Sequence, residues 1–312
     1  MIETRNLGTI GLEVIGVDAA KAIDDDLARQ LVALWREEGV LLFRNVGVAP
    51  ELLLNLSRCF GELEPHPVPD LRLPEYPELI LLTNKGGPRG PVYAFDGVPT
   101  YGRIPWHTDL AFQEVPNAGA LLNMVEKATI GGRTAWLDTA AAYDALDESL
   151  KRRIEGLEVR FEFCTDLSRV RFGNENGTRV GEMKMNFPDY PPQARPLVWK
   201  HPQTGRAIMN ICPLNLQGIV GMDEAESDEL LQTLIDKLCQ PQFIYEHDWA
   251  QGDIILWDNY RMMHRAEGHP LDVIRAVHRT TLRGSAKVGR TIAPHTALIA
   301  CDDAHGQPQQ QR

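Results

Sequence analysis

The sequence predicts a mainly β fold with flanking helices, of the β-sandwich or jelly-roll kind. Most of its patterned segments are short, apolar and bounded by turn residues, which is typical of strands. Far fewer segments repeat their apolar residues with the 3.6-residue period of a helix. No glycine-rich phosphate loop follows any early strand candidate, so a parallel dinucleotide-binding sheet lacks its fingerprint.

The first hundred residues alternate strand and helix candidates. Strand-like apolar segments lie at 10–18, 40–46 and 78–84. Residues 24–39 predict a helix, with acidic residues at its start and Gly39 at its end, and 50–64 predict a second helix. Residues 84–103 are rich in Gly and Pro and hold no sustained period, so they predict a long loop of the functional kind.

The rest of the chain is mostly strand-like. Strand candidates lie at 118–128, 131–138, 196–202, 206–210, 243–249, 253–259 and 274–284. Residues 138–157 predict the clearest helix, capped near Asp138 or Thr139, and 223–239 predict another. A second irregular stretch runs from about 164 to 196. We expect one domain over 1–285 and an extension over 286–312 whose end is disordered.

Composition narrows the functional classes. The 312 residues are 43% hydrophobic and 24% charged, as in ordinary soluble proteins, and the net charge of −11 argues against general nucleic-acid binding. The apolar runs are shorter than the ~20 residues of a membrane helix, and the first residues lack the pattern of a signal peptide. The five cysteines form no CxxC pair, so a reducing cytoplasm is expected.

A candidate metal site begins in "PWHTDLAF", residues 105–112. In an extended segment His107 and Asp109 share a face, although such a pair alone is more often a surface or hydrogen-bonded feature. His264 follows an apolar strand and a turn, and can supply a third ligand. Two histidines and a carboxylate on one face suit Fe(II), which must also bind a co-substrate and dioxygen. Zinc, activating water for hydrolysis, is the chemical alternative.

Four sequence blocks carry a family resemblance: "WHTD" (106–109), "GGRTAWLD" (131–138), "WDNYRMMH" (257–264) and "IRAVHRTTLRG" (274–284). In this order and spacing the chain resembles the taurine and 2,4-dichlorophenoxyacetate dioxygenase family from about Gly11 to Gly284. The resemblance implies a double-stranded β-helix (jelly-roll) core, Fe(II), and 2-oxoglutarate and O2 as co-substrates. It further implies a small-molecule substrate and a homo-oligomer, either dimer or tetramer.

The resemblance also implies residue roles. His107, Asp109 and His264 would bind the iron, and Thr134 and Arg275 would bind the distal carboxylate of 2-oxoglutarate. The residue types fit, because guanidinium offers a planar fork to a carboxylate and a threonine hydroxyl can donate to the same group. Taken singly, Thr134 would be interpreted as a surface threonine and Arg275 as a surface ion pair.

Further residues are candidates for substrate binding. Arg279 lies four residues after Arg275, so on a strand it shares that face, whereas His278 should face away. We expect Arg279 to bind an anionic group of the substrate or to support the cofactor carboxylate. His66 matches a family position that touches substrate. The loops 84–104 and 164–195 are expected to border the pocket and contribute Tyr101, Arg103 and Arg171.

The expected reaction is hydroxylation of an unactivated C–H bond, with release of succinate and CO2. The presence of Asp109 argues against halogenation, because related halogenases lack this carboxylate. Desaturation, ring formation and epimerisation use the same ligands and stay open, as do a zinc hydrolase and an inactive binding protein. Asp258 and Asn259 are expected to form the turn before His264. The remaining histidines are expected to be exposed or capping: His201, His247, His269, His295 and His305.

Overall fold

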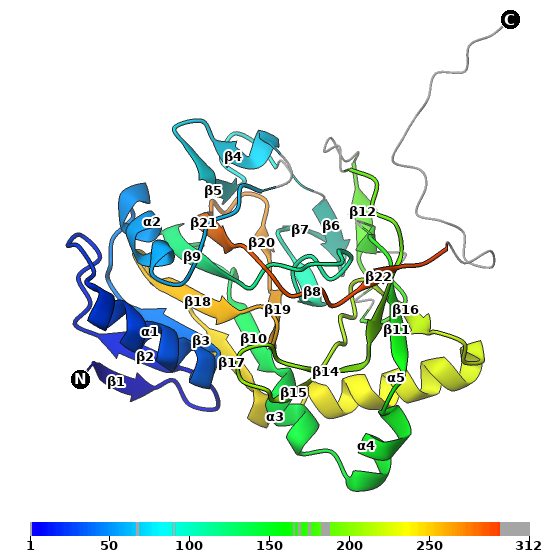
Figure 1. The fold of residues 1–312 in the computed structure, drawn as a ribbon. Helices are drawn as coiled ribbons and strands as arrows, with labels where there is room; N and C mark the ends of the chain where they lie inside the picture. The colour runs from blue at the N-terminus through cyan, green and yellow to red at the C-terminus, as the bar shows by residue number, and fades with distance from the viewer. Residues whose placement is uncertain are drawn as a thin grey trace, which may run out of the picture.

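The computed structural model describes residues 2–66, 69–88, 90, 92–164, 166–167, 170–173, 176–181 and 188–293. Its strands form one large sheet, one smaller sheet that packs against it, and several short peripheral sheets (Figure 1).

The large sheet has eight strands. In spatial order they are β1 (Glu3–Asn6), β2 (Leu12–Ile15), β3 (Val40–Phe43), β18 (Ile254–Asp258), β9 (Gly119–Glu126), β21 (Ala276–Leu282), β5 (Tyr76–Thr83) and β4 (Arg72–Leu73). All neighbours are antiparallel except β2 and β3, which run parallel. Strands close in space therefore come from both ends of the chain.

The smaller sheet has four antiparallel strands and carries the metal-site candidates. Its order is β17 (Ile244–His247), β10 (Thr134–Asp138), β19 (Met262–Ala266) and β8 (Ile104–His107). The β8–β19 register places His107 directly opposite His264. Directly opposed residues on antiparallel strands have neighbouring side chains. Two histidines 157 positions apart (264 − 107) are thus brought together by strand pairing alone.

The two sheets share a buried apolar cluster, which shows that they pack face to face. Leu122, Ile255 and Val277 come from the large sheet, and Trp136 and Met262 from the small one. Alternate residues of each strand point into this cluster, as in a sandwich. The predicted mainly β fold with flanking helices is confirmed.

Two helices, α1 (Asp25–Glu38) and α2 (Pro50–Arg58), cover the outer face of the large sheet (left in Figure 1). The first was predicted with its ends: Asp24 accepts from the Leu27 N–H, and Gly39 closes the helix with φ 76°. That φ favours glycine. The second helix ends earlier than predicted, because residues 63 and 64 are extended and pair with the end of β21.

The predicted helix over 138–157 is in fact two helices, α3 (Thr139–Asp144) and α4 (Glu148–Ile154). Asp138 caps the first, as expected, by accepting from two backbone N–H groups. Asp147 starts the second by accepting from the Leu150 N–H, since aspartate in a helix interior competes for backbone donors. The predicted helix over 223–239 is α5 (Glu224–Leu238).

The predicted loop 84–103 is wrong in its central part, which forms a hairpin of β6 (Val92–Phe95) and β7 (Val98–Tyr101). Asp96 and Gly97 turn it, both with positive φ, as a two-residue hairpin turn requires. The hairpin is flanked by β12 (Thr178–Val180) and β20 (His269–Pro270).

The other short sheets join β16 (Leu216–Ile219), β11 (Glu158–Phe161), β13 (Gln193–Pro196) and β22 (Arg290–Thr291), and separately β14 (Val198–Lys200) with β15 (Ala207–Met209). Because β22 pairs with β13, the fold continues past residue 285. The expected disordered end and His295 and His305 lie outside the described residues. Within the described part, no helix combines the length and the apolar composition needed to cross a membrane.

Three histidines expected to be exposed or capping are buried: His201, His247 and His269. His201 also caps a turn, because its Nδ1 atom accepts from the Gln203 and Thr204 N–H groups at 3.2 Å. His201 bonds Asp258 and His247 bonds Asp253, at 2.8 and 3.0 Å. A buried polar ring needs such a partner. The sequence alone did not indicate that Asp258 and Asp253 would bind these histidines.

Candidate metal centre and cosubstrate pocket

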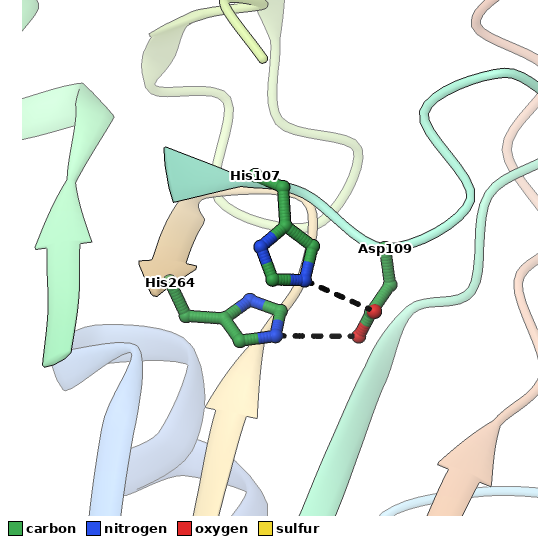
Figure 2. A group of neighbouring side chains, drawn as sticks. All are labelled: His107, Asp109 and His264. Atoms are coloured by element: carbon green, nitrogen blue, oxygen red, sulfur yellow. Dashed lines mark ion pairs between the residues drawn. The ribbon is translucent and has the colours of Figure 1, made fainter. Parts of the chain in front are cut away.

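His107, Asp109 and His264 converge at one point (Figure 2). One ligand atom from each lies within 4.8 Å of the others. The Nε2 atoms of His107 and His264 are 3.8 and 3.9 Å from the two oxygens of Asp109. Both histidines are more than nine-tenths buried. The cluster leaves a side open toward a cavity, which is the arrangement of a facial triad.

The histidines are in the form that binds a metal. The His107 Nδ1 atom lies 2.9 Å from the Pro105 carbonyl, so it carries the proton and leaves Nε2 as a free electron pair. Burial lowers the pKa of His107 and lowers that of His264 well below its usual value. Burial would raise the pKa of Asp109, but the Arg279 guanidinium beside it outweighs burial, and that pKa lies at about 2. The donor set is therefore neutral, neutral and anionic at pH 7, as a divalent ion requires.

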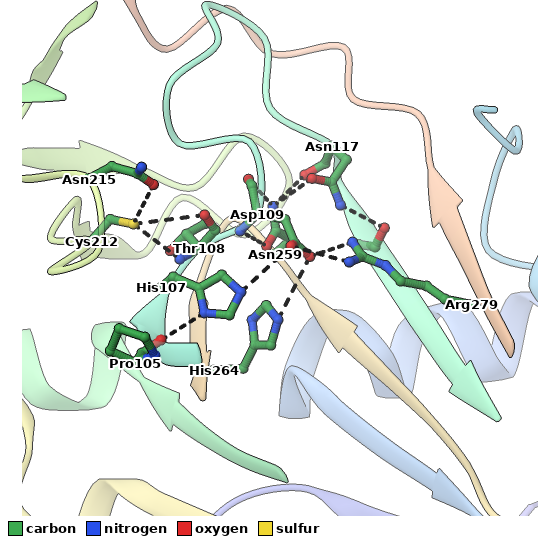
Figure 3. A network of polar contacts seen from close by, with 11 residues as sticks. Pro105, His107, Thr108, Asp109, Asn117, Cys212, Asn215, Asn259, His264 and Arg279 are labelled. Carbon is green, nitrogen blue, oxygen red and sulfur yellow. Dashed lines mark hydrogen bonds and ion pairs between the residues drawn. The ribbon is translucent and has the colours of Figure 1, made fainter. Parts of the chain in front are cut away.

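Asp109 is fixed through its backbone by Asn259 (Figure 3). The Asn259 side chain accepts from the Asp109 N–H at 2.9 Å and donates to the Asp109 carbonyl at 3.0 Å. The same amide donates to Asn117, and its exposed fraction is zero. Asn259 was expected only to form a turn. Asp258 does so, by accepting from the Tyr260 N–H.

Arg279 fixes the carboxylate of Asp109. Its two terminal nitrogens donate to the two Asp109 oxygens at 3.3 and 2.6 Å. A bidentate pair of this kind holds both the position and the charge of the carboxylate. The even spacing from Arg275 predicted that Arg279 faces the pocket, but not that it pairs with Asp109, a candidate metal ligand.

A cavity of about 290 Å³ opens beside the three residues. Its apolar wall includes Leu71, Ile80, Leu82, Leu122 and Val277. Among the described residues that line it, Asp109 is the one acidic side chain, whereas several are basic: His66, Arg103, Arg133, His269, Arg275 and Arg279. The cavity therefore suits anions that carry an apolar body.

Arg275 and Thr134 face this cavity, as the prediction for them requires. No carboxylate in the described part of the chain pairs with Arg275, its Nε atom is buried without a partner, and burial lowers its pKa to about 10. Such a guanidinium stays charged at pH 7, and a buried unpaired charge is costly. A Cβ on Gly132 would lie 3.1 Å from the Arg275 side chain, so glycine makes room for it.

The remaining substrate candidates divide into two groups. His66, Tyr101 and Arg103 line the cavity as predicted, and Arg103 stacks on the Phe95 ring at 4.2 Å. His278 is not among the lining residues, which agrees with its predicted direction.

Arg171 is the exception. It does not line the cavity, because Glu224 and Asp228 of α5 bind its guanidinium. None of the described residues of 164–195 lines the cavity, contrary to the expectation that this loop borders it.

Sequence reasoning missed Asn259 and also Trp249, whose indole Nε1 donates to the Thr134 hydroxyl at 3.0 Å. Each bonds a site residue more than a hundred positions away. The one available signal for Asn259 was its place in the block shared with His264. Nothing in the local pattern indicated Trp249.

Residues 3–281 match the family described as taurine catabolism dioxygenase TauD, TfdA family. The chain belongs to this family. A relative named (S)-phenoxypropionate/alpha-ketoglutarate-dioxygenase, from Sphingobium herbicidovorans, is 35% identical over 267 residues, which cover 83% of this chain and 86% of that protein. The predicted family and enzyme class, a 2-oxoglutarate-dependent dioxygenase, are confirmed.

Solved structures agree with this assignment. A putative alpha-ketoglutarate-dependent taurine dioxygenase from Burkholderia xenovorans superimposes with a TM-score of 0.75 and 26% identity, over 95% of this chain and 96% of that one. AAD-2, solved with Mn(II) and N-oxalylglycine, gives 0.72 and 25% identity, over 92% and 99%. The jelly-roll core of this family is thus the fold of the chain.

Proposed function

We propose that this dioxygenase uses Fe(II) and 2-oxoglutarate to hydroxylate a small carboxylic acid with an apolar, aryloxy-type body. The observation that carries the proposal is Arg275, an uncompensated guanidinium that lines the same cavity as the three candidate ligands. A metal and a fixed cation in one pocket fit a co-substrate with a chelating end and a distal carboxylate.

The three ligands fit Fe(II) by their donor types. His107 and His264 would each offer Nε2, and Asp109 one oxygen, while Arg279 keeps the carboxylate in place. Bound iron would couple decarboxylation of 2-oxoglutarate to oxidation of a substrate C–H bond, with succinate and CO2 released. Arg275 and Thr134 would hold the distal carboxylate and so orient the co-substrate before dioxygen reacts.

The cavity supports an anionic substrate without an amino group. Asp109, its one described acidic residue, is already paired with Arg279, so no carboxylate is left for an ammonium group such as that of taurine. His66 and Arg103 lie where a substrate anion can be bound, and the aliphatic wall suits a ring. The relative named for (S)-phenoxypropionate supports the same class.

The test is a comparison of candidate substrates with the Fe(II) enzyme. Hydroxylation of 2-phenoxypropionate at the carbon that bears the phenoxy oxygen gives a hemiketal, which breaks down to phenol and pyruvate. We expect (S)-2-phenoxypropionate, 2-oxoglutarate and O2 to yield phenol, pyruvate, succinate and CO2 in equal amounts. Taurine should give only the succinate of the substrate-free control. Stimulation by taurine but by neither enantiomer of the aryloxy acid would refute the substrate class.

A further inference from the structure

The hydroxyl of Thr134 receives a hydrogen bond whose direction is unambiguous. The Trp249 Nε1 atom lies 3.0 Å from the Thr134 Oγ1, and both residues are nearly fully buried. An indole N–H can only donate. Thr134 must therefore accept this bond, and its own proton remains available. Among the described residues, Thr134 accepts no other side-chain hydrogen bond, and it lines the cavity that Arg275 faces.

Trp249 is itself held firmly. Its ring packs edge-on against His247 at 4.8 Å and against Trp136 at 6.2 Å. The turn that carries it, between β17 and β18, is closed by Asp253, whose carboxylate accepts from His247 and from the Ala250 N–H, both at 3.0 Å. An ordered donor confines the partner hydroxyl to the directions that remain around its oxygen.

Burial of a tryptophan does not by itself produce such a bond in this protein. Trp35, Trp136 and Trp257 are also buried, and their indole N–H groups have no partner among the described residues. The Trp249 bond ends on Thr134, the threonine proposed to bind the co-substrate. The fold thus leaves other indole donors unpaired and supplies this one to Thr134.

We propose that Trp249 is a positioning residue for the co-substrate: it orients the Thr134 hydroxyl so that its proton points to the distal carboxylate of 2-oxoglutarate. The inference rests on the proposed role of Thr134 in binding that carboxylate. A hydroxyl already directed at the anion loses little freedom when the anion binds. No covalent step is involved, so Trp249 should affect the affinity for 2-oxoglutarate and not the turnover of bound co-substrate.

The test is a double-mutant cycle on Trp249→Phe and Thr134→Val, read as the affinity of the anaerobic Fe(II) protein for 2-oxoglutarate by calorimetry. We expect Trp249→Phe to weaken binding about tenfold in the Thr134 protein, a loss near the worth of one hydrogen bond. In the Thr134→Val background the same change should matter less than twofold, because the hydroxyl to be oriented is gone. Thr134→Ser, which keeps a hydroxyl, should stay responsive to Trp249→Phe.

Trp136→Phe is the matched control. It removes the same bulk from a neighbouring buried tryptophan whose N–H has no partner in the described part of the chain, and we expect less than a twofold change in 2-oxoglutarate affinity. In steady state, Trp249→Phe should raise the KM for 2-oxoglutarate and leave kcat within twofold. If Trp249→Phe does not fold, benzothienylalanine at position 249 removes the N–H with nearly the same shape.

The possible results distinguish failure of the proposed role of Trp249 from failure of the proposed function on which it rests. An equal loss from Trp249→Phe in both backgrounds, or a similar loss in Trp136→Phe, means that Trp249 acts only through packing, and the inference is wrong. No loss in the Thr134 background also overturns it. If Thr134→Val itself leaves 2-oxoglutarate affinity unchanged, the proposed role of Thr134 fails first, and the inference fails with it. If the unmodified Fe(II) protein does not bind 2-oxoglutarate, the proposed function is wrong.

Discussion

Arg275 and Arg279, four positions apart, differ in their binding partners in this pocket. Arg279 is neutralised by Asp109, whereas Arg275 has no carboxylate partner among the described residues. The charge of Arg275 is therefore available for a ligand, and that of Arg279 is already used. The sequence could predict that both arginines lie on one face, because residues an even number of positions apart on a strand point to the same side. It could not predict which of them binds a protein carboxylate.

We expect Arg275→Ala to weaken 2-oxoglutarate binding roughly 30-fold or more. Leaving one charge of a desolvated pair without its partner costs on the order of 2–5 kcal/mol, and each ~1.4 kcal/mol is tenfold. Anaerobic titration of the Fe(II) variant measures this step apart from turnover. Arg133→Ala is the control, because Arg133 also lines the cavity but pairs with Glu246, and it should bind 2-oxoglutarate within twofold of the parent.

His264→Ala should abolish stable metal binding and nearly all turnover, because a two-ligand site holds a divalent ion poorly. Metal analysis after dialysis is the measurement. His269→Ala is the matched variant, since His269 is buried beside the same cavity but is not one of the three convergent ligands. Full metal occupancy in His264→Ala, or equal loss in both variants, would contradict the assignment of the ligands.

Helices and hairpins were predicted correctly where their capping or turn residues were recognised in the sequence. They were missed where those residues were overlooked. The acidic residues at its start and Gly39 at its end located α1 correctly. The Asp96–Gly97 pair is a strong hairpin signal that the Gly/Pro content of the surrounding residues obscured. The break at Asp147 was missed because apolar periodicity continues across it.

The orientation of the site residues depends on contacts between elements that are far apart in the sequence. Asn259 reaches Asp109 across 150 positions, and Arg171 is bound by α5 instead of facing the pocket. The family resemblance supplied the candidate metal ligands and the candidate co-substrate residues, because those lie within recognisable sequence blocks. The residues that orient them could be found only once the strands were paired.

The β6–β7 hairpin should respond to ligands. Tyr101 ends it and lines the cavity with Gly102 and Arg103, which follow. The strands that flank the hairpin are short, with three residues in β12 and two in β20. We expect amide hydrogens of β6 and β7 to exchange more slowly when 2-oxoglutarate and an oxidisable aryloxy acid are bound together under anaerobic conditions. Exchange of the distant helix α5 should not change. Equal exchange in β7 with and without bound ligands would show that the hairpin does not close over the pocket.

At the scale of the whole molecule, buried histidines should make the metal-free protein sensitive to acid. Burial lowers the pKa of four of them: His107, His264, His269 and His278. Below the ordinary value of about 6.5 the unfolded chain then binds more protons than the folded one, so stability falls as the pH falls. The stability that the neutral, buried histidines contribute is fully present above pH ~6.5.

His278 allows this to be tested away from the metal ligands. Denaturant unfolding of the metal-free protein at pH 7.5 and 5.5 should show a loss of stability that is smaller in His278→Leu. One group contributes at most roughly 1.4 kcal/mol per pH unit. Because His278 does not line the cavity, the variant should bind 2-oxoglutarate normally. An unchanged pH dependence in His278→Leu would mean that this histidine is protonated equally in both states.

We propose that the two sheets together form one site, with three metal ligands and a separate cation for 2-oxoglutarate. The most direct test is the visible spectrum of the anaerobic Fe(II) protein as 2-oxoglutarate is added. Chelation of Fe(II) by the keto acid should give a weak metal-to-ligand charge-transfer band that saturates at one equivalent. His264→Ala should give no band, and Arg275→Ala should reach the same band only at much higher 2-oxoglutarate. A parent protein that binds Fe(II) and 2-oxoglutarate without this band, or an Arg275→Ala titration identical to that of the parent, would contradict the account.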